Sequence, residues 1–256
     1  SYPDRTNARG IWKISDIYKN KTSDGTYPGA GGFKAINSGG FNASNAYTAN
    51  IDVFNMSTSG NATDFGDLPF NLLNHGTCSS TTRGIFLGGN QASPNAYNDE
   101  ISYIHFASEG NGADFGNLTT SCQHSTGASN ETRGLNMGGL NPDNVQKVVD
   151  FITIASIGNS TDFGDLTAAT NQAASMSSPT RALYVGGATP SLVDTICFAE
   201  ISSTGNFVDF GDLIATNKQG TKGNLSSQTI GIRAGGFLAS DVFTTSTEQI
   251  QIGSLG

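Results

Sequence analysis

Asn61–Leu68 reads NATDFGDL, and this stretch recurs three times along the chain. The near-copies are NGADFGNL (Asn111–Leu118), NSTDFGDL (Asn159–Leu166) and NFVDFGDL (Asn206–Leu213). Successive Asp-Phe-Gly triplets lie 50, 48 and 47 residues apart. A Gly-Gly pair recurs 49, 50, 48 and 49 residues apart, beginning at Gly39, Gly88, Gly138, Gly186 and Gly235. Two landmarks with one period indicate an internal repeat, and a period of about 40 to 50 residues is typical of propeller blades or helical arrays.

The local pattern of each repeat favours strands over helices. Glycine, Asn-Gly and Ser-Gly steps interrupt the chain about every ten residues, which a pair of helices would not tolerate. TRGIFLGG (Thr82–Gly89) is a short apolar run closed by two glycines, and NDEISYIHFAS (Asn98–Ser108) and KVVDFITIAS (Lys147–Ser156) alternate between two faces as strands do. A turn, the Asp-Phe-Gly strand and a polar strand, such as residues 121–129, follow. Four strands are the content of one propeller blade.

The repeat resembles the kelch family, whose blades begin with a strand that ends in Gly-Gly and continue with an apolar alternating strand. The matching segments are Arg83–Gly89, Arg133–Gly139 and Arg181–Gly187. Kelch repeats usually carry Trp on the third strand and Tyr on the second, whereas this chain has Phe after the turn and a single Trp, Trp12. We therefore expect an all-β protein, a β-propeller with four-stranded kelch-like blades, about five of them.

The domain organisation follows from the repeat. We expect an N-terminal entry or closure segment, residues 1–38, and a repeat propeller domain, residues 39–256. The repeat units lie near 39–87, 88–137, 138–185, 186–234 and 235–256. The last unit stops where the next Asp-Phe-Gly would begin, and propellers close best when both termini contribute to one blade. We expect the N-terminal segment to supply the missing strands; a further segment or a neighbouring chain is the alternative.

A second resemblance covers essentially the whole chain. RGIWKISDIYKNKTSDGTYP (Arg9–Pro28) is similar to the entry segment of tail proteins from phages, especially marine ones, and KVVDFITIASIGNSTDFGDLT (Lys147–Thr167) resembles their tandem units. The resemblance implies a tail, fibre or appendage protein located in the virion. It also implies recognition of a host cell-surface glycan, contacts with other tail proteins, and a homo-oligomer in the particle.

Composition excludes several classes of partner. The formal charge is −8 and the 13 Lys and Arg residues are scattered, so the chain is unsuited to nucleic-acid backbones and to anionic membrane surfaces. No apolar run approaches the roughly 18 residues of a membrane span. Cys78, Cys122 and Cys197 follow neither a disulfide nor a metal-ligand spacing.

The acidic motifs do not predict an enzyme. A kinase uses one Asp-Phe-Gly together with a His-Arg-Asp catalytic loop, whereas this chain has four copies and no His-Arg-Asp. We expect the Phe to be a core residue between blades and the Gly a tight bend. The pairs Asp64/Asp67, Asp162/Asp165 and Asp209/Asp212 recur, whereas a glycosidase needs one carboxylate pair in two different environments. Calcium binding by these turn acids is a weaker alternative.

The histidines are expected to be surface side chains, and the arginines to be structural. His75, His105 and His124 show no metal-ligand spacing, although a metal site shared between blades is the alternative. Arg83, Arg133 and Arg181 occupy equivalent positions, where a repeated arginine usually bonds a blade carbonyl or a turn carboxylate. We expect no metal and no cofactor.

The best binding candidates follow the Gly-Gly pairs, because loops on a rigid scaffold carry function. The first two loops both contain Asn-Ala-Tyr, which names Asn45, Tyr47, Asn95 and Tyr97 as ligand-binding candidates. A tyrosine ring beside an amide offers an apolar stacking face with hydrogen-bonding groups, a combination suited to sugars. The alternative is that Tyr47 and Tyr97 merely begin the second strand of their blades.

These observations predict a non-enzymatic attachment protein that binds host glycans through its blade loops. A purely structural virion protein that docks other tail or capsid proteins is the first alternative. A glycan-degrading enzyme is the second, and it would require one asymmetric cluster of acids or histidines that breaks the repeat. The sequence contains no such cluster.

Overall fold

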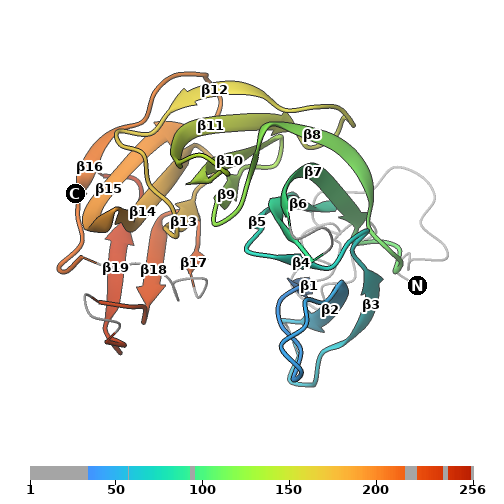
Figure 1. Cartoon of the computed structure of the whole chain (residues 1–256). Coiled ribbons are helices and arrows are strands. Elements are labelled where there is room, and N and C mark those ends of the chain that lie inside the picture. The colour runs from blue at the N-terminus through green and yellow to red at the C-terminus, as the bar shows by residue number, and fades with distance from the viewer. Residues whose placement is uncertain (1–33, 57, 93–95, 217–223, 239–241, 255–256) are drawn as a thin grey trace, which may run out of the picture.

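The computed structural model describes residues 34–56, 58–92, 96–216, 224–238 and 242–254. Its described residues form nineteen β-strands and no helix. The strands make five antiparallel sheets arranged as the blades of a five-bladed β-propeller, with blades 1 and 5 at the two ends of the series (Figure 1). The prediction of an all-β propeller of about five blades is confirmed. The expected N-terminal closure strands fall on residues 1–33, which lie outside the described residues.

The strands follow the repeat in chain order. Blade 1 contains β1 (Lys34–Ser38), β2 (Asn50–Asn55) and β3 (Thr63–Asp67). Blade 2 contains β4 (Leu72–Leu73), β5 (Gly76–Ser79), β6 (Arg83–Gln91), β7 (Ala96–His105) and β8 (Ala113–Cys122). Blade 3 contains β9 (Thr126–Ser129), β10 (Arg133–Leu140), β11 (Val145–Thr153) and β12 (Thr161–Asp165). Blade 4 contains β13 (Ala174–Ser177), β14 (Arg181–Thr189), β15 (Ser191–Glu200) and β16 (Val208–Asp212). Blade 5 contains β17 (Leu225–Ser226), β18 (Ile230–Ala234) and β19 (Thr247–Gln251).

Within a blade, the four kinds of strand have a fixed order. The polar strand is innermost, the Gly-Gly strand and the alternating strand follow, and the Asp-Phe-Gly strand is outermost, as in the sheet β13-β14-β15-β16. Figure 1 shows β5, β9, β13 and β17 toward the centre and β3, β8, β12 and β16 on the outside of the arc. The polar strand that follows one Asp-Phe-Gly strand therefore begins the next sheet.

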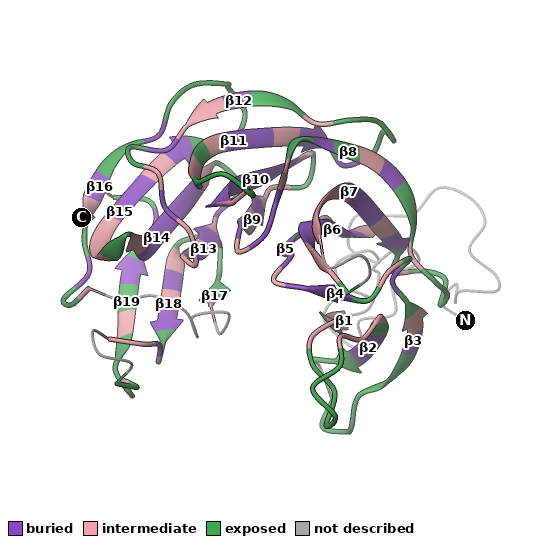
Figure 2. Ribbon diagram, viewed as in Figure 1, coloured by how far each residue is buried: buried purple, intermediate pink, exposed green. Residues whose placement is uncertain are grey.

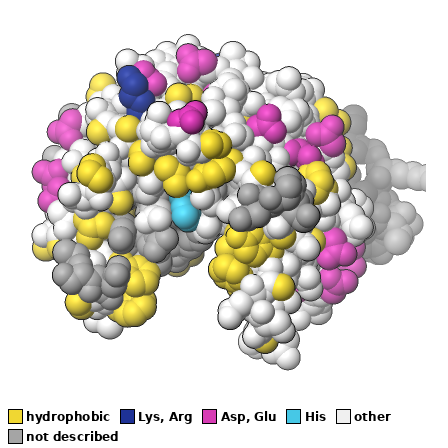
Figure 3. All heavy atoms as spheres, in the orientation of Figure 1, with side chains coloured by type: hydrophobic (Ala, Val, Ile, Leu, Met, Phe, Trp, Pro, Cys, Tyr) yellow, Lys and Arg dark blue, Asp and Glu magenta, His cyan; other side chains and the backbone are white. Residues whose placement is uncertain are grey.

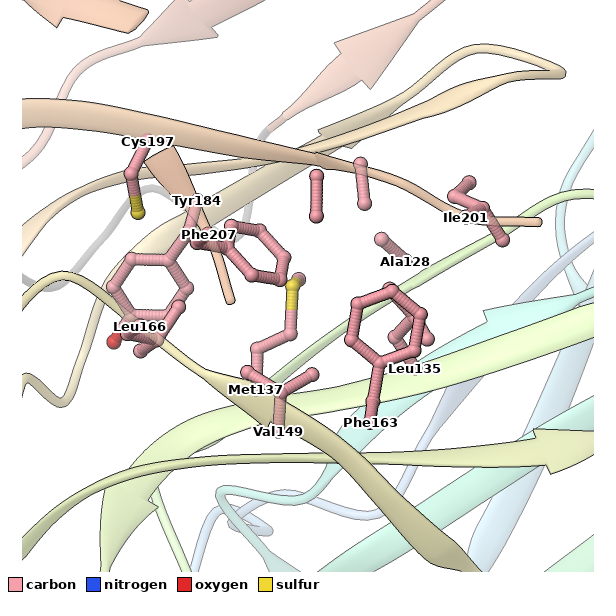
Figure 4. Close-up of a cluster of buried hydrophobic side chains, with 12 residues drawn as sticks. Ala128, Leu135, Met137, Val149, Phe163, Leu166, Tyr184, Cys197, Ile201 and Phe207 are labelled. Atoms are coloured by element: carbon pink, nitrogen blue, oxygen red, sulfur yellow. The ribbon is translucent and has the colours of Figure 1, made fainter. Parts of the chain in front are cut away.

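The phenylalanine of each Asp-Phe-Gly triplet is a core residue at the junction between two blades. Four separate clusters of buried side chains contain Phe65, Phe115, Phe163 and Phe210. In the junction between blades 3 and 4, Met137 and Phe163 from one blade point toward Phe207 from the next (Figure 4). Figure 2 shows the same trend for the whole arc, with buried residues in the strands and exposed residues in the peripheral turns. The interpretation of the Phe as a core residue between blades is confirmed, whereas the expected tight bend is wrong, because each Gly lies within its outer strand.

The glycine of the triplet allows two blades to approach closely. Gly164 has a φ of +144°, and a Cβ there would lie 2.5 Å from the carbonyl oxygen of Gly205 in the next blade. Gly66 and Gly116 have the same relation to Gly110 and Gly158. An adjacent asparagine fixes the contact, since Asn206 Oδ1 accepts a hydrogen bond from the backbone N–H of Asp165 at 3.0 Å. Only glycine fits this approach without moving the neighbouring backbone.

The repeated arginines join consecutive blades. The Nη1 atoms of Arg83, Arg133 and Arg181 donate to the carbonyl oxygens of Ile154, Ile201 and Ile252, each in the following blade, at 2.7, 3.1 and 3.1 Å. Each guanidinium also lies over an aromatic ring of its own blade, at 4.6 to 4.8 Å from the ring centre. Lys34 replaces the arginine in blade 1 and donates to Phe106 O at 3.1 Å. The prediction that the arginines are structural is confirmed.

Candidate functional site

The loop between β1 and β2 presents an exposed aromatic pair. Phe41 and Tyr47 form a β-bridge, and their rings pack edge to face with centroids 5.3 Å apart. Phe41 is 61% exposed and Tyr47 is half-buried. Asn42 Oδ1 accepts hydrogen bonds from the backbone N–H groups of Ser44 and Ala46, both at 2.9 Å. These bonds hold the loop in one shape, so the aromatic pair is presented on a fixed support.

Asn45 contributes to this loop through its backbone. Its φ is +55°, a left-handed conformation that asparagine tolerates better than most residues. Its N–H donates to the carbonyl of Asn42 at 3.0 Å. The side chain is exposed beside Tyr47. The structure therefore places two of the predicted residues, Asn45 and Tyr47, in one exposed loop.

The loop between β18 and β19 in blade 5 repeats this arrangement. Phe237 and Phe243 form the equivalent β-bridge, with ring centroids 4.4 Å apart, and Phe243 is 75% exposed. The N–H of Leu238 donates to Val242 O, as the N–H of Asn42 donates to Ala46 O. Val242 is exposed beside the pair. The two end blades thus present similar aromatic surfaces on loops of the same type.

The second predicted loop, which follows Gly88-Gly89, does not present its tyrosine in the way that the first loop does. Tyr97 lies within β7, paired with Asn90 on β6, and is half-buried. Asn95 lies outside the described residues. Two amide atoms near Tyr97, Asn90 Oδ1 and Asn98 Nδ2, are buried without a hydrogen-bond partner among the described residues. Tyr97 therefore occupies a strand position, whereas Tyr47 precedes its strand.

Sequence reasoning missed Phe41, Phe237 and Phe243. It searched the loops for tyrosine and so set aside the fifth loop, which contains phenylalanine. The signal was present in the shared pattern Gly-Gly-Phe-x-Ala-Ser, at Gly39–Ser44 and Gly235–Ser240. This pattern places an aromatic residue directly after the glycines, and the bridge brings a second aromatic residue to it.

The described side chains of the two loops suit contacts with sugars. Exposed aromatic faces stack on the apolar faces of sugar rings, and neighbouring amides and hydroxyls hydrogen-bond their edges. In the described part of the loops the side chains are aromatic, aliphatic, amide or hydroxyl groups, with no carboxylate or histidine to transfer a proton. A general acid or base must reach the proton that it moves.

The acidic residues of the Asp-Phe-Gly strands are distributed over separate outer strands. Asp64, Asp162 and Asp209 are exposed on three different blades, and Asp165 forms an ion pair with Lys147 at 2.9 Å. The one buried aspartate in the described residues, Asp150, accepts hydrogen bonds from the backbone and hydroxyl of Thr119 in blade 2. Some acids lie close together: Asp150 is the register partner of Asp162, and the pKa of Glu100 is raised by burial and by the charges of Asp114 and Asp99.

His75 and His124 occupy different positions of the repeat, eleven and ten residues after their Asp-Phe-Gly aspartates. Strand pairing makes Gly76 equivalent to Thr126, because they pair with Leu87 and Met137, the residues before the Gly-Gly pairs. His75 is therefore equivalent to Ser125, and His124 to Asn74. His75 Nε2 lies 3.1 Å from Ser38 Oγ at the junction of blades 1 and 2. The part of the chain that the structure describes contains no group of three or more potential metal ligands.

The cysteines are poor nucleophiles at neutral pH. All three are free and buried. Burial raises the pKa of the Cys78 thiol to about 12, and it also raises the pKa of the Cys122 and Cys197 thiols. The thiolate is the reactive form of cysteine, so these side chains act as small packing groups.

The central channel is lined by small polar side chains of the inner strands. Hydroxyls there link blades: Ser175 Oγ donates to Gly127 O at 2.7 Å and lies 2.7 Å from Thr126 Oγ1. Ser129 Oγ donates to Ser79 O in the same way. These hydroxyls are committed to blade contacts, so the channel is a weaker candidate site than the aromatic loops.

Figure 3 shows acidic side chains scattered along the arc and basic ones in few places, in agreement with the net charge of −8. No described helix is long and apolar enough to cross a membrane. Compared with protein-family models and with curated proteins, the chain matches none of them.

Proposed function

We propose that this propeller is a non-enzymatic attachment module of a phage tail or appendage, and that it binds a host cell-surface glycan. The observation that carries the proposal is the pair of equivalent loops with exposed aromatic side chains, Phe41/Tyr47 and Phe237/Phe243. The virion origin is supported by the resemblance of Arg9–Pro28 and Lys147–Thr167 to phage tail proteins.

Two similar loops on one chain favour multivalent binding. An aromatic ring that stacks on a sugar contributes little by itself, and a surface polysaccharide repeats the same sugars many times. Linking two weak contacts raises the overall affinity by about 100-fold or more where both can bind at once. Several copies of the chain in a particle, with other tail proteins as neighbours, would multiply the effect again.

The proposal is tested with labelled full-length protein on a panel of bacterial cells and their purified surface polysaccharides. We expect saturable binding of the unmodified protein. Two double variants, Phe41→Ala/Tyr47→Ala and Phe237→Ala/Phe243→Ala, should each lower the affinity by about tenfold or more, because each removes one of the two binding loops. Ile214→Ala is the matched control, because Ile214 is a highly exposed apolar residue outside both loops. Binding that all three variants retain in full would place the site elsewhere.

A purely structural role in the virion is the second candidate. Phe54 and Met56 in blade 1 are exposed apolar residues that favour a protein contact. Failure to bind any cell or polysaccharide would support this role. Product analysis of the incubated glycans tests the enzyme alternative, since shortened chains would contradict the non-enzymatic proposal.

A further inference from the structure

The outer part of β2 in blade 1 exposes two apolar positions that the other blades bury fully or in part. Phe54 pairs with Ala35, and strand pairing makes it equivalent to Ile104, Ile152, Ala199 and Ile250. Those four side chains are at most 8% exposed, whereas Phe54 is 42% exposed. Met56 is 61% exposed, whereas its equivalents Ile154, Ile201 and Ile252 are fully buried and Phe106 in blade 2 is half-buried. We call the surface formed by Asp52, Phe54, Met56 and Asn61 the blade 1 face.

The four junctions inside the chain show what such a face binds. In each junction, the Phe and the following Leu of an Asp-Phe-Gly-Asp/Asn-Leu strand pack on the residues equivalent to Phe54 and Met56. Phe210 and Leu213 pack on Ile250 and Ile252 in this way, in the cluster between blades 4 and 5. Since the four junctions are alike, the blade 1 face has the shape and the apolar character of a surface that accepts the same strand.

The polar groups of the blade 1 face fit the same occupant. Asn111, Asn159 and Asn206 each accept a hydrogen bond from a backbone N–H of the preceding Asp-Phe-Gly strand, at 3.0 Å. Asn61, the equivalent residue in blade 1, is exposed and has no such partner among the described residues. Asp52 is equivalent to Asp150, which accepts from the N–H of Thr119, the residue after the Asp-Phe-Gly-Asn-Leu stretch. Both acceptors are thus in place for an incoming strand.

The occupant does not come from the described strands of the chain or from their copies. The four Asp-Phe-Gly strands of the chain, β3, β8, β12 and β16, all pack on their own next blade. Residues 1–33 contain no Asp-Phe-Gly. Blade 5, the end that a second copy would present, has exposed Ala234, Thr247 and Gln249 where blade 2 has Leu87, Ile101 and Tyr103. That surface is too polar to repeat the apolar junction.

We propose that the blade 1 face binds an Asp-Phe-Gly-Asp-Leu strand carried by another polypeptide that contains this repeat. The Phe and Leu of that strand cover Phe54 and Met56, its glycine lies against the turn before β3, and its backbone N–H groups donate to Asn61 and Asp52. The contact continues the blade-to-blade junctions of the chain across a subunit boundary. Figure 3 shows hydrophobic side chains near β1 and β4, beside the hollow between the two ends of the arc.

The test uses the full-length protein and a fluorescent synthetic peptide with the sequence NSTDFGDLT, as at Asn159–Thr167. We expect saturable binding at peptide concentrations up to about millimolar. The affinity should fall by about tenfold or more in Phe54→Ser/Met56→Ser and by less in Asn61→Ala. Ile157→Ser is the matched control, because Ile157 is an exposed apolar residue in a turn of blade 3. A peptide with alanine in place of its glycine should not bind, since its Cβ would meet the turn backbone.

Other outcomes would overturn the proposal. Failure to bind the peptide, or equal binding by the Phe54→Ser/Met56→Ser variant, would show that the face does not accept the strand. Trp12 is the sole tryptophan of the chain, so a red shift of its emission in that variant would show that residues 1–33 occupy the face. Concentration-dependent dimers that the variant loses would identify a second copy as the occupant. Peptide binding and glycan binding use different residues, so either proposal can fail without the other.

Discussion

Replacing Phe163 with alanine tests whether the Asp-Phe-Gly motif is architecture. Phe163 is 2% exposed and lies in the cluster of twelve buried residues between blades 3 and 4. Its ring packs edge to face with Phe151 and Phe207. Removing a buried Phe side chain costs about 3 to 5 kcal/mol, from lost burial and from the cavity left behind. For a domain of this size we expect the melting temperature to fall by roughly 6 to 20 °C.

The assay is thermal unfolding followed by far-UV circular dichroism, with two control variants. Val208→Ala removes an exposed apolar side chain from the start of an equivalent strand, and we expect a change of less than about 0.5 kcal/mol. Asp162→Asn changes the exposed acid of the same triplet, and we expect no loss of stability. A melting temperature that is unchanged in Phe163→Ala, or that falls equally in Asp162→Asn, would refute the architectural interpretation.

Three further predictions concern the blade junctions. Arg133→Ala should lower the free energy of unfolding by about 1 to 3 kcal/mol in urea titrations, because the hydrogen bond to Ile201 O and the stacking on Phe151 are lost. Arg133→Lys should lower it by less, because a lysine makes the equivalent hydrogen bond in blade 1. Gly164→Ala should destabilise by more than about 1 kcal/mol through its clash with Gly205, whereas Gly253→Ala, which meets open space, should be neutral. The buried Cys78 thiol has a pKa above that of an unfolded thiol, so its contribution to the free energy of unfolding is fully present below about pH 8.5 and should be lost as the pH rises toward about 12. A thiol reagent at pH 8 should therefore label Cys78 only after unfolding.

The sequence predicted the fold because the repeat carries several consistent signals. Gly-Gly pairs, alternating strands and the Asp-Phe-Gly triplet each recur with one period, so an error in one signal would have been corrected by the others. A polar strand was predicted near residues 121–129 as the fourth strand of its unit, whereas the structure has it at Thr126–Ser129 as the innermost strand of the next blade. The hydroxyls of the inner strands are used between blades, as Thr126 and Ser175 show.

The candidate site was only partly predictable. Asn45 and Tyr47 lie in an exposed loop, but the partner ring, Phe41, is brought to Tyr47 by a β-bridge that a list of tyrosines does not reveal. The equivalence of His75 with Ser125 could be counted from the sequence, since each lies eleven residues after its Asp-Phe-Gly aspartate, and the strand pairing agrees with it. Loop geometry and register depend on backbone hydrogen bonds that sequence spacing alone does not define.

Blades 1 and 5 depart from the repeat in opposite ways. Blade 5 has Ile230 where blades 2 to 4 have an arginine clamp, and polar Thr247 and Gln249 where they have apolar residues, so its outer surface is suited to water. Blade 1 keeps the apolar positions Phe54 and Met56, so its outer surface is suited to another blade. Terminal repeats of an array normally carry a polar cap. If the blade 1 face binds a strand as proposed, contacts between copies of the repeat would have a defined direction, with the strand added on blade 1 and not on blade 5.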